Sequence, residues 1–245
     1  MNKLGLLGRN ISYSFSRAYF TQKFKEEGLS EDYSYENFDI QTISEFPSVL
    51  RNNPDAIGMN VTIPYKEEVI PFLNHLSENA KAIGAVNTIK ILPNGDLEGH
   101  NTDYFGFTES LKPLLQNHHR KALILGTGGA AKAVAFGLQT LGIQYQYVSR
   151  KTSENTISYE EINHNLFEEH TIIINCTPLG TSPNIETCPP IPYNYFTGKH
   201  IAYDLIYNPE ETEFLKRAKQ KKAVTKNGYE MLVLQAEKAW KIWTD

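Results

Sequence analysis

Residues 121–150 constrain the fold of this chain more than any other stretch, because an apolar strand pattern, a glycine turn and a helix pattern follow one another there directly. The apolar run 122–125 leads into Gly126 and Gly128, and Ala131 completes a G-x-G-x-x-A arrangement. The first glycine permits a tight turn, the second lets the backbone approach a pyrophosphate, and the small third residue lets the helix pack on the strand. We therefore expect a dinucleotide site at this helix start, with an ordinary tight turn as the alternative.

The end of the next expected strand, residues 145–150, indicates which dinucleotide binds. An Asp or Glu at that position would hold a ribose 2′-hydroxyl, but this chain has Ser149 and Arg150, followed by Lys151 and Thr152. A carboxylate would repel a 2′-phosphate, whereas a guanidinium can bind one with two parallel hydrogen bonds. The pattern favours NADP over NAD. The alternative is a solvated strand end with no ligand.

Composition excludes several classes of function. A chain of 245 residues with 40% hydrophobic residues can form one large domain or two of ordinary size. No apolar run approaches the roughly eighteen residues of a membrane helix, and the first ten residues lack a signal-peptide core, so we expect a cytoplasmic protein. A net charge of −4 without a basic stripe argues against nucleic acid as a partner. The two cysteines and seven histidines lack the spacing of a metal site, so we expect no metal.

Strand and helix patterns alternate along the whole chain, which predicts two α/β halves with a cleft between them and polar strand ends facing that cleft. The expected strands are 4–8, 33–40, 56–63, the hairpin 85–92 with 97–101, and then 122–125 and 145–150, followed by strand-then-turn patterns over 171–184 and 201–209. The expected helices start near Ser16, Lys66 and Asp103, follow the glycine turn, and cover 210–220 and 228–243. Pro71 is expected to bend or end the second of these helices.

Polar side chains stand out at the ends of the first strands. Ser14 and Ser16 are two residues apart and point the same way if their segment is extended, although Ser16 could instead cap a helix. Asn60, Thr62 and Lys66 close an apolar strand and the proline turn beyond it. The ordinary alternative is that Lys66 is a solvent-exposed surface lysine without a functional role. The neighbouring Asn-x-Thr at the end of an apolar strand makes this alternative less favoured.

Two further polar residues come later in the first half. Asn87 lies in an expected strand that would otherwise prefer an apolar or β-branched residue. Asp103 starts an expected helix, where it could act as the cap and also bind a substrate.

Six motifs occur in the order and spacing of the shikimate dehydrogenase family, which the chain resembles over nearly its whole length. They read GLLGxxIxxSxS, NVTxPxK, GAVNT, NTD, GxGGA and GYEMLVLQA. The resemblance implies two α/β domains with a cleft between them: an N-terminal substrate-binding and catalytic domain over 1–102, and a Rossmann-type NADP-binding domain over 103–227. The C-terminal helix, about 228–245, is expected to pack back on the first domain.

The resemblance also implies the site residues. It assigns Lys66 and Asp103 as the catalytic pair. The implied substrate ligands are Ser14, Ser16, Asn60, Thr62, Lys66, Asn87, Asp103, Tyr207 and Gln235, with the two serines on a carboxylate and the others on ring hydroxyls. The implied NADP contacts are Gly126, Gly128, Gly129, Ala130, Ser149, Arg150, Thr177 and Gly228.

The implied function is the reversible, NADP-dependent reduction of 3-dehydroshikimate to shikimate in chorismate and aromatic amino acid biosynthesis. A lysine ammonium can polarise the substrate ketone and supply its proton, and an adjacent carboxylate favours the charged ammonium. The nearest alternative is a relative that also oxidises quinate or uses NAD; another is a non-catalytic sensor of a nucleotide or metabolite. Retention of both Lys66 and Asp103 argues against a sensor. The partner is a small molecule, and the protein acts as a monomer or a homodimer.

The chain departs from the family pattern at two positions near the serines. Arg17 stands where the family usually has proline, and Tyr19 stands where it usually has histidine. Arg17 either adds positive charge beside a carboxylate site or points to solvent.

Overall fold

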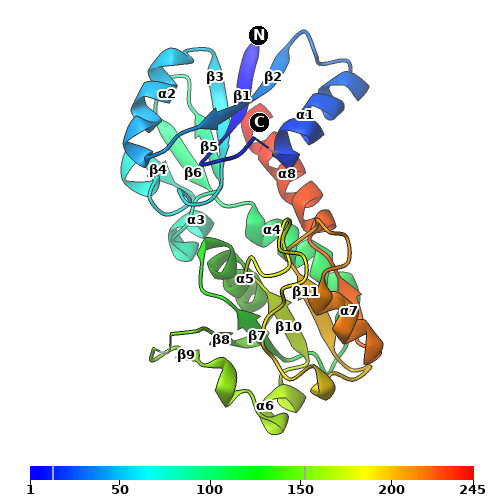
Figure 1. The fold of residues 1–245 in the computed structure, drawn as a ribbon. Helices are drawn as coiled ribbons and strands as arrows, with labels where there is room; N and C mark the ends of the chain where they lie inside the picture. Colours follow the sequence, from blue (N-terminus) through cyan, green and yellow to red (C-terminus); the bar gives the residue numbers. More distant parts are fainter. Residues whose placement is uncertain (13, 152) are drawn as a thin grey trace. The chain divides into compact units, whose positions relative to one another are not determined.

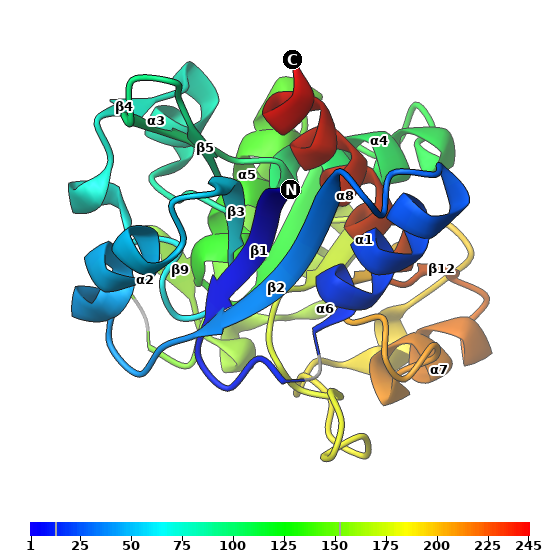
Figure 2. The same ribbon diagram turned by 90° about the horizontal axis from the view of Figure 1, so that it is seen from above.

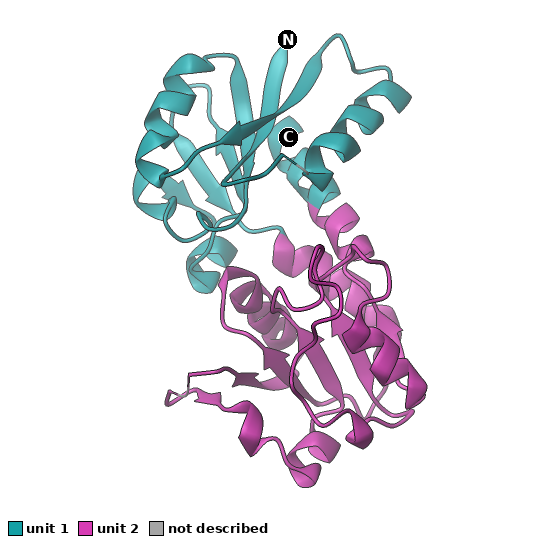
Figure 3. Cartoon of the chain, in the orientation of Figure 1, with its two compact units in different colours: residues 1–102, 236–245 teal, residues 103–235 magenta. Residues whose placement is uncertain are grey.

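The computed structural model describes residues 1–12, 14–151 and 153–245. The chain forms two compact units, which Figure 3 shows in different colours. Unit 1 contains residues 1–102 and 236–245, and unit 2 contains residues 103–235. No helix of the described residues is long and apolar enough to cross a membrane.

Unit 1 is built on one mixed sheet (Figure 1). Its strands are β1 (Asn2–Gly8), β2 (Tyr33–Asp39), β3 (Ala56–Val61), β4 (His75–Leu76), β5 (Thr88–Ile91) and β6 (Leu97–His100), in the order β2-β1-β3-β5-β6-β4. β1 pairs in parallel with β2 and β3, whereas β5 runs antiparallel to β3 and β6. The ends of β1, β2, β3 and β6 and the start of β5 therefore lie at one edge.

Alternating side chains give this sheet two apolar faces. On one face Leu4 and Tyr35 pack with α1 (Phe15–Glu26) and with the end of α8 (Tyr229–Thr244) (Figure 2). The Trp243 ring of α8 fills the space that a side chain at residue 58 would occupy, which glycine leaves open. The Trp243 indole N–H donates to the Ile89 carbonyl at 2.9 Å. The other face packs with α2 (Phe46–Asn52) and α3 (Glu78–Ile83).

Unit 2 is a doubly wound sheet in which every strand pair is parallel. Its strands are β7 (Lys121–Leu125), β8 (Gln144–Val148), β9 (Thr156–Ile157), β10 (Ile172–Asn175), β11 (Ile201–Asp204) and β12 (Val224–Lys226), in the order β12-β11-β10-β7-β8-β9. α4 (Asp103–Leu111), α5 (Gly129–Thr140) and Met231 of α8 cover one face. α6 (His164–Glu169) and α7 (Glu213–Gln220) cover the other. Strands buried on both faces explain the continuous apolar runs of the sequence.

One expected helix is absent. The segment after Lys66 forms turns and a short 3₁₀ helix, Ile70–Phe72, rather than the α-helix expected from residue 66. The Lys66 carbonyl accepts a hydrogen bond from the Val86 N–H at 2.7 Å. In an α-helix this carbonyl would instead accept from the N–H four residues later, at residue 70. Pro71 has no N–H to donate in any case.

Candidate functional site

The glycine turn of unit 2 leaves an open helix start. Gly126, directly after β7, has a φ of +106°, a conformation that side chains other than glycine rarely adopt, and the Cys176 backbone lies against it. Gly128 is the exposed N-cap of α5, and Gly129 and Ala130 form its first turn. Because the N-cap residue is glycine, it has no side chain that could accept the N–H groups at this start. The turn therefore has the geometry to hold a pyrophosphate.

A basic pocket of about 700 Å³ lies beside this turn. It is lined by Thr127, Ser149, Arg150, Lys151, Ser153 and Thr156. Arg150 and Lys151 are exposed, and the Ser149 hydroxyl accepts the Lys151 N–H at 3.3 Å. Two cations and several hydroxyls suit a phosphate monoester, so these residues fit the 2′-phosphate of NADP. Thr152 lies outside the described residues.

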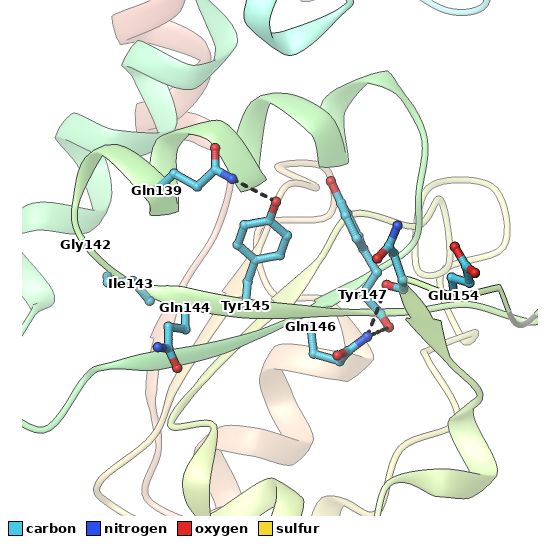
Figure 4. Close-up of a pocket in the computed structure, with 9 residues that line it drawn as sticks. Gln139, Gly142, Ile143, Gln144, Tyr145, Gln146, Tyr147 and Glu154 are labelled. Carbon is cyan, nitrogen blue, oxygen red and sulfur yellow. Dashed lines mark hydrogen bonds between the residues drawn. The ribbon is translucent and has the colours of Figure 1, made fainter.

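A second pocket, of about 780 Å³, lies along β8 (Figure 4). None of the predicted site residues lines it. Tyrosine and amide side chains line it, and Gln139 of α5 donates to the Tyr145 hydroxyl at 3.2 Å. Its lining has no lysine, arginine or histidine. This pocket therefore lacks the charge that would hold a phosphate.

Thr177 stands just after β10, where a buried asparagine fixes it. The Asn175 Oδ1 atom accepts both the Thr177 N–H at 3.0 Å and the Thr177 hydroxyl at 2.7 Å. Asn175 is completely buried, so this double contact sets the backbone and the side chain of Thr177 together.

Tyr207 and Gly228 belong to neighbouring segments of unit 2. Tyr207 is half-buried after β11 and lines a pocket of about 560 Å³ with Asn208, Asn227 and Tyr229, among others. Gly228 directly precedes α8, and its N–H donates to the Ile206 carbonyl at 3.0 Å. A Cβ at residue 228 would overlap the Leu205 carbonyl, so only glycine fits there. Gln235 is buried in the same helix and donates to the Leu232 carbonyl at 3.0 Å.

The serine pair of unit 1 takes two different positions. Ser14, not Ser16, is the N-cap of α1, and its hydroxyl accepts the Arg17 N–H at 3.3 Å. Ser16 hydrogen-bonds to the hydroxyl of Tyr35, which donates to Asn60 Oδ1 at 2.7 Å. Burial raises the pKa of Tyr35 well above its usual range. The expectation that Ser16 could cap the helix was wrong, because the N-cap is Ser14, two residues earlier.

Two residues of β2, Asn37 and Asp39, hold the segment that precedes Ser14. Neither was predicted from the sequence. The Asp39 carboxylate accepts the N–H groups of Asn10 and Ile11 at 2.8 and 3.2 Å. Asn37 donates to the Ile11 carbonyl at 2.9 Å. These hydrogen bonds hold Asn10 and Ile11, which precede α1, against the end of β2.

Asn60 and Asn87 connect the next segments of the same edge. Asn60 donates to the Asn87 carbonyl at 3.3 Å and to the Thr88 hydroxyl at 3.2 Å. The Asn87 Oδ1 atom accepts the Thr102 N–H at 2.6 Å, and its amide donates to the Thr102 hydroxyl at 2.9 Å. Asn87 lies just before β5 rather than inside it. It therefore anchors the residue that precedes Asp103.

Thr62 and Lys66 frame the proline turn after β3. The Thr62 N–H donates to the Leu7 carbonyl at 2.9 Å, and both side chains are half-buried. Asp103 is buried and is the first residue of α4.

The predicted residues thus gather at one edge of each sheet. In unit 1 these are Ser14, Ser16, Asn60, Thr62, Lys66 and Asn87. In unit 2 they are Gly126, Gly128, Gly129, Ala130, Ser149, Arg150, Thr177, Tyr207 and Gly228. Carboxyl ends of parallel strands are the usual position for ligands in such folds.

The two departures from the family pattern have different surroundings. The Tyr19 hydroxyl hydrogen-bonds to Glu237 of α8, and its ring stacks on Phe15 at 5.6 Å. Lys23 also contacts Glu237, at 3.0 Å. Tyr19 therefore connects α1 to α8, while Arg17 is exposed.

The cysteines Cys176 and Cys188 are free and partly buried. Within residues 1–12, 14–151 and 153–245, no group of three or more His, Cys, Asp or Glu side chains has the arrangement of a metal site.

Comparison with known proteins agrees with this arrangement. Residues 6–89 match the family model for the shikimate dehydrogenase substrate binding domain. The chain is 37% identical to the NADP⁺-dependent shikimate dehydrogenase of Caldicellulosiruptor saccharolyticus, with 100% of this chain and 93% of that protein covered.

Two solved structures extend the similarity to the whole fold. The shikimate 5-dehydrogenase of Thermus thermophilus, in complex with NADP(H) and shikimate, matches with a TM-score of 0.88 at 31% identity, covering 100% of this chain and 94% of that one. The quinate dehydrogenase of Corynebacterium glutamicum, in complex with NAD, matches with a TM-score of 0.87 at 27% identity, covering 99% and 93%. The chain thus has an N-terminal substrate domain and a Rossmann-type domain, and it belongs to the shikimate dehydrogenase family.

Proposed function

We propose that this protein is an NADP-dependent shikimate dehydrogenase, an oxidoreductase that reversibly reduces 3-dehydroshikimate to shikimate in chorismate and aromatic amino acid biosynthesis. The observation that carries the proposal is the full-length similarity to NADP⁺-dependent shikimate dehydrogenases, at 37% identity to one of them. The open glycine turn and the basic pocket beside it support the choice of cofactor.

In this proposal unit 2 binds NADP. The start of α5 holds the pyrophosphate through Gly126, Gly128, Gly129 and Ala130. Ser149 and Arg150 would hold the 2′-phosphate, because a guanidinium can bind a phosphate through two donors. Thr177 and Gly228 contact the nicotinamide end. Bound NADPH supplies the hydride.

The polar edge of unit 1 binds the substrate. The hydroxyls of Ser14 and Ser16 hold the carboxylate, and Asn60, Thr62 and Asn87 hold ring hydroxyls; Tyr207 and Gln235 of unit 2 complete the proposed ligand set. A ligand set with so many polar groups selects for hydroxyls, because an analogue that lacks one leaves a polar partner unsatisfied.

Lys66 and Asp103 are the proposed catalytic pair. The Lys66 ammonium donates a hydrogen bond to the ketone oxygen, which polarises the carbonyl, and it gives that oxygen its proton as the hydride reaches the carbon. The Asp103 carboxylate, the partner of Lys66 by the family resemblance, accepts a hydrogen bond from the neighbouring substrate hydroxyl. We further propose that the enzyme acts in the cytoplasm, as a monomer or a homodimer, and without a metal.

The proposal is tested by following NADPH absorbance with purified protein, shikimate and NADP. The same assay is run with NAD in place of NADP and with quinate in place of shikimate. Fast reduction of NADP with shikimate, and slow reduction in the other pairings, is the expected result. No reduction in any pairing, although the protein binds NADP, would instead favour a sensor.

A second candidate is a dehydrogenase that accepts quinate or NAD, because the chain also resembles a quinate dehydrogenase in complex with NAD. The charges of Arg150 and Lys151 in the basic pocket weigh against NAD. Comparable rates with quinate, or with NAD, in the same assay would establish this second candidate.

A further inference from the structure

A buried polar network joins the carboxyl ends of β10 and β11. Asn175 and Asp204 are neighbours in the parallel pairing of these strands, and Thr212 is the N-cap of α7. All three residues are completely buried. None of them belongs to the ligand set proposed above.

Asp204 accepts hydrogen bonds from three directions. Its Oδ1 atom accepts from the Asn175 amide at 3.0 Å and from the Ile206 N–H at 3.0 Å. Its Oδ2 atom accepts from the Thr212 hydroxyl at 2.6 Å. Because all three contacts are donors, the network is arranged around the ionised carboxylate.

One arm of the network leads to Thr177. The Asn175 amide, oriented by its hydrogen bond to Asp204, presents Oδ1 to the N–H and the hydroxyl of Thr177 at 3.0 and 2.7 Å. It also donates to the Leu179 carbonyl at 3.3 Å. The loop after β10 therefore takes its position from Asp204 through Asn175.

The other arm leads to Tyr207 and Gly228. Asp204 holds the N–H of Ile206, and the carbonyl of Ile206 accepts the Gly228 N–H at 3.0 Å. Tyr207 follows Ile206 directly. Thr212 closes the far end of this segment, since it donates to Asp204 and caps α7.

We propose that Asp204 is a positioning residue for the nicotinamide end of NADP, acting through Asn175 on Thr177 and through Ile206 on Tyr207 and Gly228. The proposal rests on the proposed function, because it takes these three residues as ligands. Asp204 itself touches neither ligand.

The cost of burying this carboxylate supports a role beyond packing. Burial raises the pKa of Asp204 to about 7, although the hydrogen bonds from Thr212, Ile206 and Asn175 lower it. A neutral side chain would fill the space at lower cost, whereas a carboxylate can orient three donors from three segments at once.

The network is tested with Asp204→Asn, Thr212→Val and Thr212→Ser, and with Thr108→Val as the control. Thr108 is also buried in unit 2, but its hydroxyl donates to the Tyr104 carbonyl within α4, at 2.6 Å. For each variant the NADP dissociation constant is measured by calorimetry, the KM values and kcat by the NADPH assay, and the stability by thermal unfolding.

We expect Asp204→Asn and Thr212→Val to weaken NADP binding about tenfold or more, as the loss of a buried hydrogen bond to a charge implies. They also lower kcat and raise the KM for shikimate, because the segment that Asp204 holds carries the substrate ligand Tyr207. Thr212→Ser restores NADP affinity because it keeps the hydroxyl. Thr108→Val lowers the unfolding temperature but leaves NADP affinity unchanged. If Asp204→Asn fails to fold, Thr212→Val carries the test.

Wild-type NADP affinity and kcat in a folded Thr212→Val would overturn the proposal, as would an affinity loss in Thr108→Val equal to that in Thr212→Val. Failure of the proposed function is distinguishable. In that case the wild type binds NADP but does not reduce it with shikimate, and the calorimetric affinities of the variants still decide the role of Asp204. A wild type that does not bind NADP would overturn both.

Discussion

At the scale of single residues, the chain divides into groups that meet a ligand and groups that hold them. The sequence predicted the first kind, because hydroxyls, amides and a lysine at the ends of apolar strands are conspicuous. It did not reveal the second kind. Tyr35, Asp39 and Asp204 each make their hydrogen bonds to partners on other segments, such as Asn60 for Tyr35. Only the folded structure identifies those partners.

Lys66→Ala tests the proposed proton donor. We expect kcat to fall on the order of a hundredfold or more, because the ketone oxygen loses its acid, with little change in the KM for shikimate. Lys81→Ala, in α3 of the same unit, is the matched control and should retain activity. A Lys66→Ala enzyme with near-normal turnover would remove this residue from the mechanism.

Arg150→Ala tests the choice of cofactor. Loss of the guanidinium should weaken NADP binding about tenfold or more and leave NAD binding unchanged, because NAD has no 2′-phosphate. The dissociation constants of both nucleotides are measured by calorimetry. Arg120→Ala is the control, since Arg120 precedes β7 at the opposite edge of the sheet. Equal losses for NADP and NAD would show that Arg150 does not recognise the phosphate.

At the scale of elements, periodicity predicted most strands and the long helices, but not the segments that depend on distant contacts. The strands 4–8 and 122–125 and the helix over 228–243 match β1, β7 and α8 closely. The expected helix from Lys66 was wrong, because Val86 takes its carbonyl. Short elements such as β4 and β9 have too few residues to show a period.

The loop before α1 offers a prediction at this scale. The two carboxylate oxygens of Asp39 accept the N–H groups of Asn10 and Ile11. Asp39→Asn replaces one of these oxygens with an amide nitrogen, so one of the two hydrogen bonds that hold the segment before Ser14 is lost. We expect the KM for shikimate to rise about fivefold or more, with NADP affinity unchanged. Asp55→Asn, which removes a partner of Lys3 in the same unit, is the control. A normal KM in Asp39→Asn would show that the loop does not need this carboxylate.

At the scale of the whole molecule, the sequence predicted two α/β halves because strand and helix patterns alternate throughout. The alternation of patterns did not indicate which half the C-terminal helix joins; the expectation that it packs back on the first domain came from the family resemblance. The last residues of α8 belong to unit 1, where Trp243 packs against Gly58. Periodicity within one helix does not identify the sheet it contacts, because that depends on packing.

The pH dependence of stability tests the core of unit 2. His200 is 3% exposed, its Nδ1 atom accepts the Thr197 N–H at 3.1 Å, and its other nitrogen contacts the Phe167 carbonyl at 3.1 Å. Burial lowers the pKa of His200 below its ordinary value. Below about pH 6.5 the unfolded chain therefore binds a proton that the folded chain does not, so stability falls on acidification.

His200→Gln keeps a donor and an acceptor but does not titrate. We expect this variant to lose less unfolding free energy than the wild type between about pH 7.5 and about pH 5.5, measured by urea denaturation. The raised pKa of Asp204 changes stability in the opposite direction on acidification. Both proteins contain Asp204, so its contribution cancels when their pH profiles are compared. Parallel pH profiles would show that His200 does not contribute.

The most direct test of the central claim is the reductive reaction with NADPH and 3-dehydroshikimate, with the product identified by NMR. We expect shikimate to form as the only product, in the same amount as the NADPH consumed. NADPH that is not consumed, or a product other than shikimate, would contradict it.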